Sequence, residues 1–207
     1  MAERPGFYEF NGKVRRRNAE FSWNSGFVAS QKQKNVANLH AALGRDKRCL
    51  EVSTKSTSEF GRALSAHNLK LNGYPLENVY QSSKVFEKGG PYTDLLQMPP
   101  KLVKKDERLR SSGKLTGFLY EGSMFLLEPK SLFYDYIYCL AVQQCMTVEE
   151  LRELLEYDYF TDIEFNPNKS ISTQAEAIVV VRLLIRQFGE IPELNAEDFI
   201  RFYRSCH

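Results

Sequence analysis

The segment Thr173-Gln-Ala-Glu-Ala-Ile-Val-Val-Val-Arg-Leu-Leu-Ile-Arg-Gln-Phe-Gly189 decides the kind of fold that this chain can adopt. Thr173 and Glu176 form the S/T-x-x-E pattern that caps the first turn of a helix, and Gly189 is the residue type that most often ends one. The apolar run between them is far shorter than the roughly 20 residues that span a bilayer. We therefore expect a core helix over 173–188 and no membrane segment.

Helical signals continue on both sides of this segment. Ser30 followed by Gln33 predicts a capping box for a helix that runs through Leu43, and Thr147 with Glu150 marks another helix start. Apolar residues at helical spacing predict further helices over 76–87, 101–110, 131–142, 148–157 and 196–204.

The first quarter of the chain has the character of strands and turns. Phe7-Tyr-Glu-Phe10 and the segment from Val14 to Trp23 flank Asn11-Gly12, a dipeptide typical of tight hairpin turns, so they predict an antiparallel hairpin. Leu50-Glu-Val-Ser53 alternates like a short strand.

These elements predict an α+β fold, mainly helical, in a single domain over residues 1–207. The strand- and turn-rich part is expected at 1–60 and a helical core at 61–207. The segments between the predicted elements are longer than connection requires, so some of them are expected to line a site. These segments are 53–75, 88–100, 111–130 and 158–172.

The composition restricts the class of function. The 28 Lys and Arg residues against 26 Asp and Glu residues give a formal net charge of +2, which excludes a polybasic nucleic-acid coat and favours local contacts. The first residues carry an early acid and no apolar run, unlike a secretory signal. The four cysteines are isolated and have no metal-type spacing to the three histidines. We therefore expect a cytoplasmic protein with reduced thiols, no metal and no cofactor.

The most suggestive polar pattern lies on the helix predicted over 76–87. Glu77, Gln81 and Lys84 fall on one stripe of that helix, within about 60° of one another. One interpretation is a solvated face on which acid and base pair. The other is a carboxylate and an amine directed into one pocket. Spacing alone leaves both open.

A second polar segment, Phe160 to Gln174, precedes the core helix. Its acids, amides and hydroxyls can bind a sugar or nucleotide, and the approach to a helix N-terminus suits a phosphate. An ordinary loop with Asx turns has the same composition. The cationic run from Lys101 to Lys114 is equally open, between a phosphate contact and a solvated helix face.

Several segments together resemble the NADAR family (the YbiA-like fold) and, within it, the branch that serves as antitoxin to DarT DNA ADP-ribosyltransferases. The matching stretches are Gly26–Asn35, Leu50–Ser56, Leu64–Leu69, Glu77–Gln81, Ser83–Tyr92, Phe133–Tyr136 and Phe160–Ser170. Their order and spacing extend over nearly the whole chain, and no single short motif carries the resemblance.

The resemblance implies a hydrolase of N-glycosidic bonds to ribose. In the family a helix reads approximately Glu-His-x-x-Gln-x-x-Lys, and here Glu77, Gln81 and Lys84 are kept while Asn78 replaces the histidine. Asp162 matches an acid that the family uses late in the chain. Glu77, Lys84 and Asp162 are therefore the predicted catalytic residues.

The resemblance also implies a set of residues that hold the substrate. The family uses a tryptophan for which we assign Phe125, which can stack but cannot donate an indole hydrogen bond. The predicted substrate-binding residues are Ser53, Lys55, Tyr80, Gln81, Phe125, Asn168, Lys169, Ser170 and Gln174.

The chemistry implied by these roles needs a proton for a poor leaving group and stabilisation of an oxocarbenium-like centre. Glu77 or Asp162 would supply the proton and orient the nucleophile. Lys84 would attack the anomeric carbon and form a Schiff base with ring-opened ribose if burial keeps its amine neutral. Its alternative role is a clamp on a phosphate or hydroxyl group.

Three functions are compatible with these residues. The first is a glycohydrolase that removes ADP-ribose from guanine in DNA and acts as antitoxin to a cognate DarT-type ADP-ribosyltransferase. The second is a hydrolase of another ribose N-glycoside in nucleotide or flavin metabolism. The third is a module that binds ADP-ribose or the toxin without catalysis.

Overall fold

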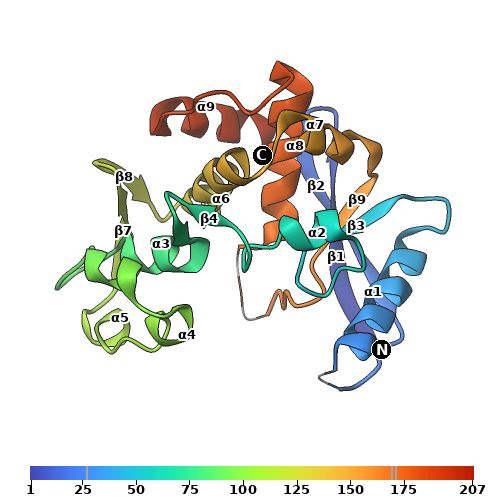
Figure 1. Cartoon of the computed structure of the whole chain (residues 1–207), viewed down its shortest axis with the longest axis horizontal. Helices are drawn as coiled ribbons and strands as arrows, with labels where there is room; N and C mark the ends of the chain where they lie inside the picture. The colour runs from blue at the N-terminus through green and yellow to red at the C-terminus, as the bar shows by residue number, and fades with distance from the viewer. Residues whose placement is uncertain (27, 169, 171) are drawn as a thin grey trace.

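The computed structural model describes residues 1–26, 28–168, 170 and 172–207 and shows a mixed α+β fold (Figure 1). The strands are β1 (Ala2–Phe10), β2 (Lys13–Phe21), β3 (Cys49–Glu51), β4 (Lys70–Leu71), β5 (Tyr74–Pro75), β6 (Lys84–Phe86), β7 (Leu115–Tyr120), β8 (Ser123–Leu126) and β9 (Tyr159–Thr161). The α-helices are α1 (Ala29–Leu43), α2 (Glu59–Ala63), α3 (Leu76–Ser82), α4 (Pro100–Val103), α5 (Arg108–Ser111), α6 (Leu132–Cys145), α7 (Val148–Arg152), α8 (Gln174–Phe188) and α9 (Ala196–Cys206). Two 3-10 helices, η1 (Thr93–Gln97) and η2 (Glu153–Glu156), complete the secondary structure.

The N-terminal sheet has the strand order β2-β1-β9-β3. The predicted hairpin forms its edge, with Asn11 and Gly12 both at positive φ (52° and 72°), as a tight hairpin turn requires. β9 pairs antiparallel with β1 and parallel with β3, which brings residues about 110 positions apart into register. This sheet therefore fixes the position of the residues that directly follow β3 and β9.

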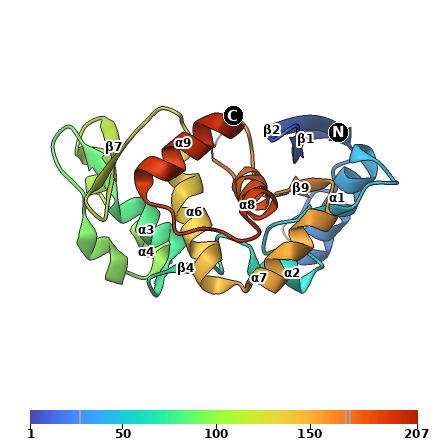
Figure 2. The same ribbon diagram turned by 90° about the horizontal axis from the view of Figure 1, so that it is seen from above.

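A smaller sheet, of order β6-β7-β8, lies at the other end of the molecule beside α3. Figures 1 and 2 place α6 and α8 between the two sheets. The main hydrophobic core includes Ile137 of α6 and Val180 of α8, both fully buried, together with Phe118 of β7 and Phe160 of β9. The two central helices thus join two halves through one core, the half with the N-terminal sheet and the half with α3 and the β6-β7-β8 sheet.

The helices whose starts carry local capping signals begin where the sequence predicts them. Thr147 and Glu150 form the predicted capping box of α7. Thr173 is the N-cap of α8, where its hydroxyl accepts a hydrogen bond from the backbone N–H of Ala175, and Gly189 at φ 82° ends the helix. The prediction for α1 was wrong in detail, because the helix begins at Ala29 without a side-chain cap.

The helix predicted over 76–87 ends at Ser82, so the single stripe through Lys84 was wrong. The hydroxyls of Ser82 and Ser83 both donate to the carbonyl oxygen of Val79, at 3.0 and 2.8 Å, and compete with the helical ladder. The chain then continues as β6, which pairs with β7. Lys84 therefore projects from a strand.

Two more predictions are corrected. The helix expected over 101–110 is broken into α4 and α5, because the Asp106 carboxylate accepts from the backbone N–H of Arg108 and starts a new turn. The segment 111–130 is mostly a hairpin, β7–β8, which turns at Glu121 and Gly122, both at positive φ. In the described part of the chain no helix is long and apolar enough to cross a membrane.

Candidate functional site

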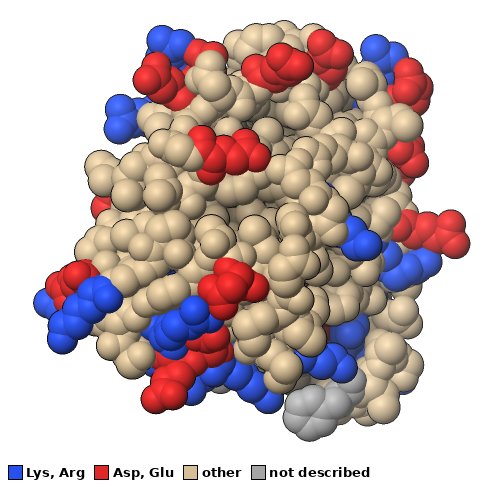
Figure 3. Space-filling view, turned by 60° about the vertical axis from the view of Figure 1, so that its left-hand side comes forward, with Lys and Arg blue, Asp and Glu red and all other residues tan. Residues whose placement is uncertain are grey.

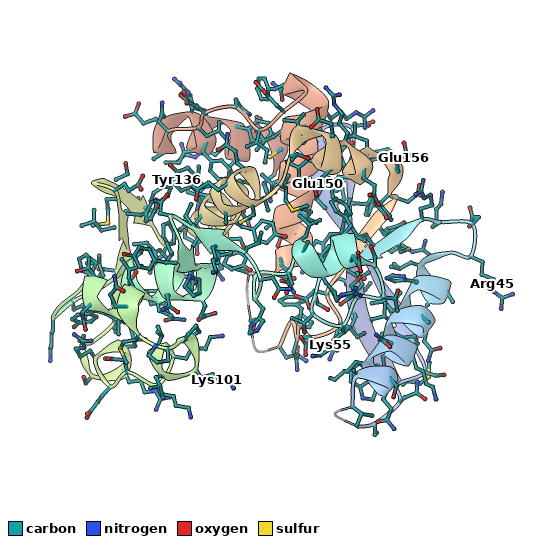
Figure 4. All side chains as sticks on the ribbon, in the orientation of Figure 1. Arg45, Lys55, Lys101, Tyr136, Glu150 and Glu156 are labelled. Carbon is teal, nitrogen blue, oxygen red and sulfur yellow. The ribbon has the colours of Figure 1, made fainter. Side chains whose placement is uncertain are left out.

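Two adjoining cavities lie where the loops after β3 and β9 approach α3 and α4. The first cavity, of about 580 Å³, is lined on the sheet side by Lys55, Asp162 and Gln174 and on the α4 side by Lys101. Lys55 and Lys101 are labelled in Figure 4, on either side of the space between the two halves.

The second cavity, of about 740 Å³, lies between α3 and the segment that follows β8, and Lys84 and Lys130 contribute to its wall. Glu77, Tyr80, Lys104 and Tyr134 line both cavities. Glu77 therefore lies at the junction between the two, and a ligand that occupies both cavities must pass beside it.

The Glu77 carboxylate is held from two directions. Gln81 Nε2, one turn further along α3, donates to Oε1 at 2.8 Å, which agrees with the predicted placement of these two residues on one face. Lys104 Nζ, just after α4, lies 2.9 Å from Oε2. The orientation of this carboxylate toward the junction is thus fixed by a neighbouring amide and a cation.

Lys84 reaches the site from the first position of β6 and lines the second cavity. Its Nζ lies 5.1 Å from the centroid of the Tyr80 ring, in a cation–π arrangement. Burial lowers the pKa of this amine, the charge of Glu77 opposes that effect, and Lys104 adds to it. The uncharged form needed for nucleophilic attack is therefore more accessible than for an exposed lysine.

Asp162 follows β9 and lies on the opposite side of Glu77, in the first cavity. Its Oδ1 accepts from the backbone N–H of Glu164 at 3.0 Å, and its Oδ2 accepts from Gln174 Nε2 at 3.0 Å. Burial raises its pKa to about 6, against the lowering effect of these hydrogen bonds. Near neutral pH, Asp162 can therefore both donate and accept a proton.

Glu51, at the end of β3, is a buried acid that the sequence analysis did not single out. Its carboxylate accepts from Ser53 Oγ at 2.5 Å, Thr161 Oγ1 at 2.7 Å and the backbone N–H of Ile163 at 2.9 Å. Burial, and then the charge of Asp162, raise its pKa to about 8. The one sequence signal was an acid inside a short alternating strand.

Tyr134 was also missed, although the stretch Phe133–Tyr136 that contains it was among those that resemble the family. It lines both cavities, and its hydroxyl makes no hydrogen bond within the described residues. Burial, followed by the charges of Asp162, Asp135 and Glu77, raises its pKa well above the usual range. Tyr134 thus offers a neutral hydroxyl at the junction.

The predicted substrate-binding residues divide into two groups. Lys55 lines the first cavity, Ser170 lines the second, and Tyr80 lines both. Gln81 lines the second cavity as well as holding Glu77. Gln174 lines the first cavity, but its amide is fixed between Asp162 and the backbone N–H of Ala66.

The remaining predicted residues do not line either cavity in the described part of the chain. Ser53 is fully buried, and its hydroxyl donates to Glu51. Phe125 is 1% exposed and packs on Phe133 and Tyr136 in the core. Asn168 is exposed in an Asx turn, where Asn166 Oδ1 accepts from its backbone N–H. Lys169 lies outside the described residues.

Asn78, which stands where the resemblance expects a histidine, has a structural role. It is fully buried, and its Nδ2 donates to the carbonyl oxygens of Leu95 and Met98 at 3.2 and 2.7 Å. This side chain ties η1 and Met98, the residue that follows η1, to α3. In the described residues, no group of three or more His, Cys, Asp or Glu side chains is arranged to hold a metal ion.

Comparison with known families gives a match to the family described as DarT1-associated NADAR antitoxin, over residues 2–207. The chain belongs to this family. No curated protein matches it. The match covers both cavities and every residue predicted for the NADAR site, so the resemblance seen in separate segments is confirmed over the whole length.

Proposed function

We propose that this NADAR antitoxin is a glycohydrolase that cleaves the N-glycosidic bond between ADP-ribose and guanine in DNA, and so reverses the product of a DarT-type toxin. The observation that carries the proposal is the position of Glu77 at the junction of two cavities, with Lys84 on one side and Asp162 on the other. A substrate with two bulky parts joined by one bond fits this arrangement.

The first cavity has the chemistry expected for ADP-ribose. Lys55, Lys101 and Lys104 contribute cations for a diphosphate. Polar side chains such as Thr54 and Tyr134 are available to the ribose hydroxyls. Of the two acids on its sheet side, Glu164 pairs with Lys55 at 3.9 Å, whereas Asp162 forms no ion pair within the described residues and is available for proton transfer.

Cleavage can be written with the residues at the junction. Asp162, whose pKa is raised to about 6, donates a proton to the guanine nitrogen as its bond to C1 of the ribose breaks. Glu77 stabilises the positive charge that develops at C1 and orients the incoming water. The water adds its hydroxide to C1 and gives its proton to Glu77, which yields free ADP-ribose and intact guanine, and proton exchange with solvent restores both acids.

Lys84 permits a covalent variant of the same reaction. Its neutral amine adds to C1 of the ring-opened ribose and forms an imine, while the guanine amine leaves with a proton. Water then hydrolyses the imine, which regenerates the lysine and releases ADP-ribose. Borohydride reduces such an imine, so a trapped protein–ribose adduct that is absent from Lys84→Met is the expected mark of this route.

The proposal is tested by incubating the protein with a guanosine-ADP-ribosylated oligonucleotide. We expect release of free ADP-ribose and of the intact oligonucleotide, reduced at least a hundredfold in Glu77→Gln, which keeps the bond to Gln81 but loses the charge beside Lys104. Glu149→Gln, an exposed acid of α7, is the matched control and should retain activity.

Two outcomes would contradict the proposal and point elsewhere. Tight binding of the modified oligonucleotide with no release by the unaltered protein would indicate a module that binds ADP-ribose. Neither binding nor release would direct the search to smaller ribose N-glycosides.

A further inference from the structure

A third cavity, of about 470 Å³, lies at the other end of α8 from the site. Leu183 and Arg186 of α8 line it, together with the hairpin turn at Asn11 and with Phe202 of α9. α8 begins at Gln174 in the first cavity, and its 15 residues make it about 22 Å long. Figure 3 shows Lys and Arg gathered along the lower edge of the molecule, at the level of α4 and α5 in Figure 1, whereas α8 ends near the top of Figure 1. A ligand in the third cavity therefore leaves the first cavity open.

The charges at the third cavity do not cancel. Glu9 is the one acid that lines it in the described part of the chain, and its Oε2 binds the guanidinium groups of both Arg182 and Arg186. The side chain of Arg182 is 13% exposed and that of Arg186 is 61% exposed, so Arg186 still faces the solvent. Lys13 Nζ lies at the rim, where it donates at 2.7 Å to the carbonyl oxygen of Ser205, a residue of the wall. One carboxylate thus stands against three cations, and the cavity can accept an anionic group.

Exposed aromatic side chains surround the same cavity. Phe10 lines it and is 58% exposed. Phe202 lines it too, and its ring centroid lies 6.3 Å from that of Phe188, which is 49% exposed and lies outside the wall. Large apolar side chains exposed together mark an interaction surface, and aromatic residues and arginine are enriched where protein partners bind. Because the aromatic surface continues past the cavity to Phe188, it suits a polypeptide better than a small molecule confined to the cavity.

We infer that the surface formed by Phe10, Lys13, Arg186, Phe188 and Phe202 binds an acidic segment of a partner protein. A large apolar side chain of that segment enters the third cavity, and a neighbouring Asp or Glu pairs with Arg186. The inference goes beyond the proposed function and does not depend on it, since these residues are separate from those that line the first two cavities.

The test uses a random peptide library displayed on phage, from which peptides that bind the immobilised protein are selected and sequenced. Two variants alter the surface, Arg186→Gln, which leaves the buried ion pair of Glu9 in place, and Phe10→Ser. Two matched controls alter exposed residues elsewhere, Arg45→Gln, at the residue labelled in Figure 4, and Leu126→Ser on β8. The affinity of each selected peptide and the midpoint of urea unfolding are then measured for every protein.

We expect the selected peptides to carry an aromatic or large aliphatic residue beside acidic residues. Their affinity should fall roughly tenfold in Arg186→Gln and in Phe10→Ser and stay unchanged in the two controls. Higher salt should weaken binding to the unaltered protein more than binding to Arg186→Gln, because salt screens an ion pair at the rim. Equal midpoints of unfolding in all the proteins would show that the variants are folded.

Three results would overturn the inference. Selected peptides without acidic residues would exclude the stated partner chemistry. An affinity that is equal in all the proteins would place the peptides elsewhere on the molecule. Self-association of the unaltered protein in sedimentation equilibrium, abolished by Phe10→Ser, would assign the surface to a second copy of this chain.

Discussion

Replacing Glu51 by glutamine should remove a loss of stability that the unaltered protein suffers as the pH rises from 6.5 to 8. The substitution keeps the shape of the buried carboxyl and the two hydrogen bonds to its Oε1, and it reverses the direction of the one with Thr161. The amide oxygen of glutamine accepts from Ser53 Oγ and from the backbone N–H of Ile163 as Oε1 does now, and its NH₂ group takes the place of Oε2 beside Thr161 Oγ1. Glutamine thus imitates the protonated acid at every pH.

The magnitude follows from the shift in pKa. The pKa of Glu51 rises from 4.5 to about 8 on folding, so the folded state holds this proton more tightly than the unfolded chain does. The free energy of unfolding therefore falls as pH rises between those values, by at most about 1.4 kcal/mol per pH unit and about 5 kcal/mol in total. Between pH 6.5 and 8 the loss is about 2 kcal/mol.

The pH range is chosen because other shifted groups titrate below it. Burial lowers the pKa of His40 from 6.5 to about 4, so His40 adds stability as pH rises, but only up to about 6.5. The pKa of Asp162 is raised from 3.8 to about 6, so its ionisation lowers the stability as pH rises toward 6 and changes it little above 6.5. Asp135 is buried with a pKa raised well above its usual range, but it is common to both proteins and cancels in their difference.

The assay is urea unfolding of both proteins at several values between pH 6.5 and 8, with Glu149→Gln as a control for loss of a surface acid. We expect Glu51→Gln to gain about 2 kcal/mol relative to the unaltered protein over this range, and the control to gain nothing. If the free energies of unfolding of the two proteins change with pH in parallel, within about 0.5 kcal/mol, Glu51 is ionised throughout this range. That result would refute the raised pKa of Glu51.

Two further predictions concern the same loops. Gly61→Ala would place a Cβ 2.2 Å from the carbonyl oxygen of Glu51 and 2.4 Å from Ser56 Oγ, so we expect urea unfolding to show a loss of about 2 kcal/mol or more, whereas an unchanged midpoint would mean that α2 can shift freely. In the hydrolysis assay, kcat should fall as pH rises above about 6, where Asp162 loses its proton, and this decline should be absent from the residual activity of Asp162→Asn. A decline that persists in the variant would assign the proton to another group.

The sequence could predict the elements whose signals are local. The turn at Asn11-Gly12 and the capping box at Thr147 depend on neighbouring residues, and both are found as expected. The strands β6, β7 and β8 were missed, because strands of three to six residues have little periodicity of their own and are stabilised by partners distant in the chain.

The site shows the same limit. Glu77 and Gln81 could be paired from sequence because they are one helical turn apart, but Lys104, which fixes the other oxygen of Glu77, lies 27 positions further along and in no motif. Glu51 binds Thr161 across 110 positions, which no spacing rule can reveal. Lys84 was predicted from the resemblance, but the direction of its side chain was not, because the helix ends at Ser82, two residues before it.

Each half of the site is held by its own buried polar group. Glu51 fixes the loops that carry Lys55 and Asp162, since it binds Ser53 on one loop and Ile163 on the other. Asn78 does the same for α3 and the segment from η1 to Met98. The distance between the two halves then depends on how α6 and α8 pack between them. Under the proposed function the ADP-ribose part of the substrate lies between the two halves, in the first cavity, so these two buried groups hold both of its walls, and the bond to be cleaved lies at the α3 side of that cavity, beside Glu77.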